Sequence, residues 1–296
     1  MINTLLVIIE QSMLHLPLMF GAYISFSLLK IPDLSIESAY VVGAIFGSYV
    51  LMGTSNLPLI GILCIVVAAS CVGGALVGIV SSLLTQKGKF AHLLSSIVTS
   101  GLFHGINQFI CPAYVSLNKM DNPLTLVNVV AQHPELIMLV IIGFAVFITI
   151  YFLLKTEIGY CYAAYGNNPQ FFKNYEISTS FVFITGVILA NALAGMSGYL
   201  FAQSNSFVEL NMGVGKGLLC ITALMLGKGL TFIKKSFSII VPLVGTCAYF
   251  TVQQLLLKIG FNLKYFTAVQ AIIVLLLLIY THYNKPIRSP NDGLGL

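Results

Sequence analysis

Long apolar runs separated by short polar segments make up most of this chain of 296 residues. A helix needs about 20 apolar residues to cross the roughly 30 Å of hydrocarbon in a membrane. The second run is short and follows the polar stretch 31–38, so a half-span or a broken helix is as open there as a full crossing. The pattern predicts an all-α polytopic membrane protein with eight or nine transmembrane helices, within the runs 2–29, 38–53, 57–84, 91–110, 135–154, 180–202, 213–229, 236–257 and 266–283.

Composition supports the membrane class. Hydrophobic residues make up 58% of the chain and charged residues 8%, with a mean hydropathy of +0.96, whereas about a quarter of the residues in a soluble domain are charged. We therefore expect one transmembrane domain over 1–296. Gly215-Lys216 and Gly227-Lys228 lack the upstream glycine of a phosphate-binding loop. The cysteines and histidines show no metal-ligand spacing. We expect no ATPase site, metal or cofactor in this chain, and no enzyme activity.

The net charge of +5 reflects basic residues in loops and predicts no nucleic-acid partner. Nine of the fourteen basic residues lie in four loops that alternate through the spans from residue 91 onward, and the positive-inside rule places such loops in the cytoplasm. The rule puts the C-terminus and segment 155–179 inside and segment 111–134 outside, as a small lid or docking surface. The side of the N-terminus stays open. The four loops hold Lys87, Lys89, Lys155, Lys173, Lys228, Lys234, Lys235, Lys285 and Arg288.

Segment 155–179 is a polar island, marked by glycine and proline, between two apolar runs. Polar backbone is tolerated near lipid only in a helix or where protein covers it, so this loop must lie in water or against a partner. Its residues predict a short helix from Gly159 to Tyr165, a break at 166–169 and a second short helix that ends near Ser178. A helix-break-helix under a membrane is a shape on which another protein can push.

Polar side chains recur every four residues along the run 91–110. Ser96, Ser100, His104 and Gln108 share one helical face, with Asn107 beside it. Polar groups within spans face the bundle interior or a water-filled path. One interpretation is a set of hydrogen bonds between helices, each worth about 0.6 kcal/mol. The other is a substrate path, to which we assign His104 and Asn107.

A second polar stretch, residues 201–217, lies between apolar runs. We place the outer mouth of the path there, although an ordinary exposed connection explains the same residues. The amides at the start of the next helix favour an anionic group such as a carboxylate. The same argument applies to Asp33 and Glu37, where Ser35 also fits a simple N-cap. The residues assigned to the mouth are Gln203, Asn205, Glu209 and Asn211.

Glycines at four-residue spacing allow close contact between membrane helices, although glycine is common in such helices. The pairs are Gly43/Gly47, Gly74/Gly78 and Gly101/Gly105.

The segment TEIGYCYAAYGNNPQFFKNYEIS resembles the cytoplasmic loop of permeases in the branched-chain amino-acid and ribose class of ABC importers. The subgroup it is most similar to is the tryptophan/tyrosine-type permeases. Three further segments resemble that subgroup, in the same order along the chain: IPDLSIESAYVVGA, TSGLFHGINQFI and LAGMSGYLFAQSNSFVELNMGVGKGLLCITALMLGK.

The resemblance implies a homodimeric permease in the bacterial inner membrane, surrounded by lipid. An ATP-binding subunit that holds ATP and magnesium would lie under each copy, and an extracytoplasmic binding protein would deliver a small polar solute such as an amino acid. Segment 155–179 would be the helix that couples to the ATPase. Ala163 and Asn167 stand where the family has arginine and aspartate, and Glu176 replaces a glycine, so the charge pairing with the ATPase must differ. The coupling residues are Gly159, Ala163, Gly166, Asn167, Asn168 and Pro169.

Two other functions agree less well with the sequence. A secondary transporter or channel that works alone would use ion-coupling acids within its spans and internal repeats. Only Glu10 is clearly embedded, and no repeat is evident. An intramembrane enzyme would need a clustered nucleophile and base or a set of metal ligands, which this sequence does not display.

Overall fold

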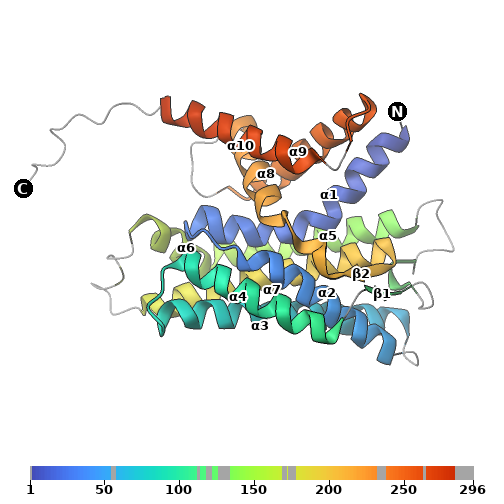
Figure 1. Ribbon diagram of the computed structural model, residues 1–296, viewed down its shortest axis with the longest axis horizontal. Helices are drawn as coiled ribbons and strands as arrows, with labels where there is room; N and C mark the ends of the chain where they lie inside the picture. The colour runs from blue at the N-terminus through green and yellow to red at the C-terminus, as the bar shows by residue number, and fades with distance from the viewer. Residues whose placement is uncertain are drawn as a thin grey trace, which may run out of the picture.

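The computed structural model describes residues 2–54, 58–111, 114–117, 122–125, 134–168, 172, 178–231, 238–262 and 265–283. Its architecture is helical apart from one short two-stranded antiparallel sheet (Figure 1). The helices in the described residues are α1 (Ile2–Ala22), the π-helix η1 (Tyr23–Leu28), α2 (Ser35–Gly53), α3 (Leu59–Gln86), α4 (His92–Ile110), the 3-10 helix η2 (Pro123–Thr125), α5 (Pro134–Lys155), α6 (Glu157–Asn167), α7 (Thr179–Asn205), the 3-10 helix η4 (Leu210–Gly213), α8 (Lys216–Thr231), α9 (Ile240–Lys258) and α10 (Phe266–Tyr283).

Seven of these helices are long and apolar enough to cross a membrane, which confirms the all-α membrane class. They are α1 with η1, α2, α3, α5, α7, η4 with α8, and α9. The predicted spans 91–110 and 266–283 do form helices, α4 and α10, but neither is among the seven. Helix α2 runs unbroken over 19 residues, so the short second run is a full-length helix.

Glycine allows three helices to touch backbone to backbone at the centre of the bundle. Helix α7 packs most extensively against α3 and α2. A Cβ atom added to Gly43 of α2 would lie 2.2 Å from Gly195 Cα of α7, and one added to Gly74 of α3 would lie 2.2 Å from Asn191 O. Real Cβ atoms essentially never come that close. Two of the three glycine pairs noted in the sequence therefore serve helix packing, as small residues do in membranes.

The remaining helices lie around this centre. Helices α8 and α9 pack against each other and against α1, on the side of the molecule away from α3 and α4 (Figure 1). The sheet pairs β1 (Tyr114–Ser116) with β2 (Phe207–Glu209), so segment 111–134 meets segment 201–217. The N-terminus and this sheet lie at one end of the bundle, and α6 lies at the other (Figure 1).

A buried hydrogen-bond network fixes the start of α2 against α7. Asp33 Oδ1 accepts the backbone N–H of Ser35 at 2.9 Å, and Asn191 Nδ2 donates to Asp33 Oδ2 at 3.0 Å. The Ser35 hydroxyl donates to Asn191 Oδ1 at 3.1 Å. Burial raises the pKa of Asp33, and the hydrogen bonds from Ser35 and Asn191 oppose that rise. Ser35 is therefore the first residue of α2 and not its N-cap, and Asp33 accepts the first N–H of the helix.

Replacing Asn191 with leucine, which has a similar shape, should lower the free energy of unfolding by about 1–3 kcal/mol, because Asp33 Oδ2 would remain buried without this donor. The thermal unfolding midpoint of the purified permease in detergent measures the effect. Ser180→Ala is the control, since Ser180 lies on α7 like Asn191 and the change removes its partly buried hydrogen bond to Gln86 of α3. Equal midpoints for the two variants would contradict the proposed importance of this network.

Candidate functional site

The polar face of α4 starts inside the bundle and ends at its surface. Ser96 is buried and bonds back to Leu93 O of its own helix. The Ser100 hydroxyl donates to Leu34 O at 3.2 Å, which joins α4 to the start of α2. His104 is exposed, whereas Asn107 is buried. Ser100 thus makes one of the expected hydrogen bonds between helices, Ser96 bonds only to its own helix, and His104 and Asn107 line a cavity.

That cavity, which we call the α4 cavity, has a volume of about 260 Å³. His104 and Asn107 line it from α4, and Glu37 and Ser38 line it from α2. Leu210, Gly213 and Val214 close it from the connection that leads to α8. The structure therefore brings the two predicted path residues of α4 together with the segment in which we placed the outer mouth.

The four residues assigned to the mouth do not form one site with His104. Gln203 is buried and accepts a hydrogen bond from the Tyr199 hydroxyl at 3.2 Å, which is a packing role within α7. Glu209 is exposed on β2 opposite Tyr114, and Asn211 is exposed on η4. Asn205 lines a different cavity, described below. These four residues are close in sequence, but their side chains point in different directions. The polarity of a residue does not predict that direction.

The start of α8 already holds a carboxylate. Helix α8 begins at Lys216, and its Gly217 N–H donates to Glu37 Oε1 at 3.0 Å. An acidic side chain at this position satisfies a free amide and complements the helix dipole. The sequence analysis predicted an anionic group at these amides. That group is the carboxylate of Glu37, which lies on α2.

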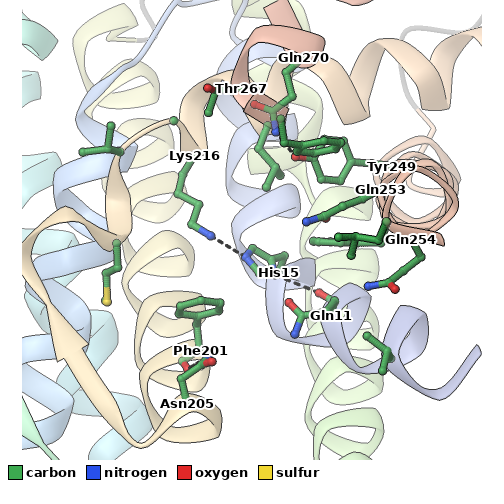
Figure 2. A pocket seen from close by; sticks show the side chains of 18 residues that line it. Gln11, His15, Phe201, Asn205, Lys216, Tyr249, Gln253, Gln254, Thr267 and Gln270 are labelled. Atoms are coloured by element: carbon green, nitrogen blue, oxygen red, sulfur yellow. Dashed lines mark hydrogen bonds between the residues drawn. The ribbon is translucent and has the colours of Figure 1, made fainter. Parts of the chain in front are cut away.

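A second cavity, which we call the Lys216 cavity, was not predicted from the sequence. It has a volume of about 460 Å³ and lies between α1, α7, α8, α9 and α10. Figure 2 shows the Lys216 side chain directed at His15 of α1, with Nζ 2.9 Å from His15 Nε2. The other ring nitrogen of His15 lies 3.0 Å from Gln11 O. The sequence does show a lysine and a histidine within apolar runs, which could have indicated a site. Nothing in the sequence indicates that these two residues, 201 positions apart, lie in contact.

Helix α6 carries most of the predicted coupling residues and is held tightly to the bundle. A Cβ atom on Gly166 would lie 1.9 Å from Leu28 O, and one on Gly159 would lie 2.4 Å from Leu154 O. Lys30 Nζ donates to Asn167 Oδ1 at 2.7 Å. Ala163 packs partly buried against the core.

The end of α6 differs from the sequence prediction. The helix continues through Gly166 to Asn167, so the break falls at Asn168, whose backbone N–H donates to Ala164 O at 2.9 Å. Gly166 is helical, and its small size allows α6 to pack closely against Leu28. Pro169 lies outside the described residues, as does most of the predicted second helix.

Comparison with known proteins settles the class of the molecule. Residues 5–278 match the family described as the permease component of the branched-chain amino acid transport system. The chain belongs to this family. It is therefore a multi-pass membrane permease of an ABC importer, without an ATPase site of its own. Permeases of this family work with an ATP-binding subunit and a substrate-binding protein.

Individual relatives agree with the family. A tyrosine transport system permease protein of Clostridioides difficile is 28% identical over 97% of this chain and 94% of its own length. An uncharacterised protein of Rickettsia prowazekii is 27% identical over 88% of this chain and 91% of its own length. The autoinducer 2 import system permease of Escherichia coli is 24% identical over 85% of this chain and 70% of its own length. No solved structure matches the chain.

Proposed function

We propose that this permease works in the bacterial inner membrane as a two-fold dimer that imports an amino acid or a similar small polar solute. The partners are a second copy of the chain, an ATP-binding subunit against α6, and an extracytoplasmic binding protein at the end that carries β1 and β2. The C-terminus lies in the cytoplasm in this arrangement. The observation that carries the proposal is the family match over residues 5–278, combined with the position of α6.

The surroundings of α6 support its role at the ATPase. Its outer surface exposes two large apolar side chains, Ile158 at 49% and Tyr160 at 59%. Its inner surface is fixed to the end of η1 through Gly166 and to Lys30 through Asn167. Ser180 donates to Gln86 near the basic pair Lys87/Lys89, at the same end of the bundle. Helix α6 is thus packed firmly against the bundle, exposes apolar side chains and lies at the same end as Lys87 and Lys89. These properties suit a helix that transmits force from an ATP-binding subunit.

The outer face of α4 supports the second copy and the path. It exposes Ile97, Val98, Leu102, Ile106 and Phe109 beside His104 and Gln108. A Cβ atom on Gly101 or Gly105 would meet nothing within 4 Å, so this third glycine pair makes no close helix contact in the part of the chain that the structure describes. Polar side chains that face lipid are costly. A second copy that packs α4 against α4 would cover this face and place His104 between the two copies.

Co-purification and uptake test the function. The permease, extracted in mild detergent from cells that express the whole transport system, should carry an ATP-binding subunit and have the mass of a complex with two permease copies. Reconstituted in liposomes with its binding protein, the complex should take up amino acid only when ATP is supplied. Proton-driven uptake by the purified chain alone would instead support a secondary transporter.

Alanine at His104 or Asn107 should change the uptake rate by about 2- to 12-fold, because both side chains line the α4 cavity and a lost polar contact is worth about 0.5–1.5 kcal/mol. Complex assembly and ATP hydrolysis without substrate should stay at the wild-type level. Ser96→Ala on the same helix face is the control, since Ser96 is buried and bonds only within α4. If the His104 and Asn107 variants fail to assemble, these residues pack helices and do not line a path.

A further inference from the structure

Lys216 places a positive charge in the Lys216 cavity without a negative partner. Among the described residues, its ammonium has one hydrogen-bond partner, the neutral ring nitrogen of His15, and no carboxylate within ion-pair distance. The rings of Phe201 and Tyr40 lie 4.6 Å and 5.0 Å from Nζ. Aromatic faces stabilise a cation only partly. Lys216 is also the first residue of α8, where the helix dipole disfavours a positive charge. Glu37 already complements the dipole of α8 at Gly217, and an anion in the cavity would supply the negative partner that Lys216 lacks.

Gln270 contributes a second polar group to the wall of the Lys216 cavity. Its side chain is 4% exposed and lines the same cavity from α10. Gln270 Nε2 donates to the Tyr249 hydroxyl, and Oε1 has no hydrogen-bond partner in the part of the chain that the structure describes. A buried carbonyl oxygen without a donor is costly and rare. The group that satisfies it must donate a hydrogen bond, as an ammonium does.

We propose that the Lys216 cavity binds the backbone of the transported α-amino acid, with its carboxylate on Lys216 and its ammonium on Gln270 Oε1. Gln11, Gln253 and Gln254 also line the cavity and provide further amide groups (Figure 2). The rings of Phe201, Tyr249 and Phe250 form the apolar part of its wall. A volume of about 460 Å³ falls within the range of small-molecule sites, about 300–1,000 Å³.

This inference rests on the proposed function, since it concerns the solute that the importer carries. It differs from the α4 path in position, although the two cavities adjoin: Val214 lines both of them. The connection 210–217 thus separates the Lys216 cavity from the α4 cavity, which is lined by Glu37 and His104. A solute held at Lys216 lies one loop away from the α4 cavity.

The first test measures occupation of Lys216 directly. The purified permease with its ATP-binding subunit is treated briefly with acetic anhydride, and acetylation of Lys216 and of exposed Lys258 is quantified by mass spectrometry. A mixture of the twenty common L-amino acids should lower the Lys216-to-Lys258 ratio at least threefold. The corresponding amino-acid amides, which keep the ammonium and lack the carboxylate, should not. An unchanged ratio with the amino acids would overturn the proposal.

An anionic lipid headgroup is the other source of negative charge near a membrane. Labelling is therefore repeated in lipid nanodiscs with and without phosphatidylglycerol, and without amino acids. The proposal requires the same Lys216-to-Lys258 ratio in both. Protection that depends on phosphatidylglycerol alone would assign the cavity to lipid and overturn the proposal.

The second test measures uptake in proteoliposomes that contain the whole importer, with each amino acid supplied in turn. Lys216→Met keeps the unbranched side chain as far as Cε and removes the ammonium group, and with it a buried charge that has no carboxylate partner among the described residues. It should raise KM for the transported amino acid by about 10- to 100-fold, because a hydrogen bond to a charged group is lost. Lys258→Met, on the exposed end of α9, is the control and should leave KM unchanged.

The two proposals fail differently. If the wild-type complex shows no ATP-driven uptake, the proposed function is wrong. If the wild-type complex takes up an amino acid and Lys216→Met has the same KM, the importer stands and the binding site at Lys216 is wrong. Gln270→Leu provides an independent variant in case Lys216→Met does not fold, and it should raise KM in the same direction.

Discussion

Replacing Gly166 with valine should abolish transport while the permease still folds and still binds its substrate-binding protein. Even the first carbon of the new side chain would lie 1.9 Å from Leu28 O, so α6 must move away from η1. Overpacking of this kind costs about 1–3 kcal/mol, which is enough to displace a short helix at the edge of the bundle. ATP-driven uptake should fall at least tenfold. Uptake and ATP hydrolysis by the reconstituted complex measure the effect.

Gly229→Val is the matched control for this variant. Gly229 lies near the end of α8, and a Cβ atom there would meet nothing within 4 Å. The control should transport at the wild-type rate. Uptake by the Gly166 variant at the same rate as the control would show that the position of α6 is not needed for coupling.

Replacing Gly198 with leucine should prevent the central three-helix packing from forming. A Cβ atom on Gly198 of α7 would lie 1.9 Å from Tyr40 O of α2, and Tyr40 is itself fully buried. Neither backbone can yield, because Gly43 and Gly195 hold the same two helices in contact. We expect a loss of about 3 kcal/mol or more in the free energy of unfolding.

The yield of monodisperse permease on size-exclusion chromatography and its thermal unfolding midpoint measure this effect. Gly53→Leu, at the end of α2, is the control because a Cβ atom there has no neighbour within 4 Å. A Gly198 variant with the yield and midpoint of the control would contradict the close approach of α2 and α7.

The sequence predicts the helices well because crossing a membrane imposes length and apolarity on each run. It does not predict which small residues are used. Gly43, Gly74 and Gly101 each begin the same four-residue spacing, yet the first two touch α7, whereas the last touches no other helix among the described residues. The difference lies in which face of each helix meets a partner, and spacing within one helix does not determine that face.

The site was harder to predict because its residues come from distant helices. Polarity alone indicated His104 and Asn107, which do line one cavity. The same reasoning selected Gln203, whose side chain is satisfied by Tyr199 within α7. Lys216 was noted only as part of a loop, since its meaning depends on His15 and Gln270, which the fold places beside it. These residues are far apart in the sequence, so no local sequence pattern predicts that they line the same cavity.

The π-helix η1 gives the molecule a place where α1 can turn. A π-helix accommodates more residues per turn than an α-helix, and short π segments occur frequently at functional sites. If η1 returned to α geometry by one residue, everything before it would rotate by about 100° relative to Lys30, since an α-helix turns once in 3.6 residues. Helix α6 contacts the C-terminal end of η1 at Leu28, and His15 lies on α1, before η1 begins. We expect that a small movement of α6 would change the geometry of η1. That change would rotate α1 about its own axis and so turn His15 within the Lys216 cavity, without tilting the helix.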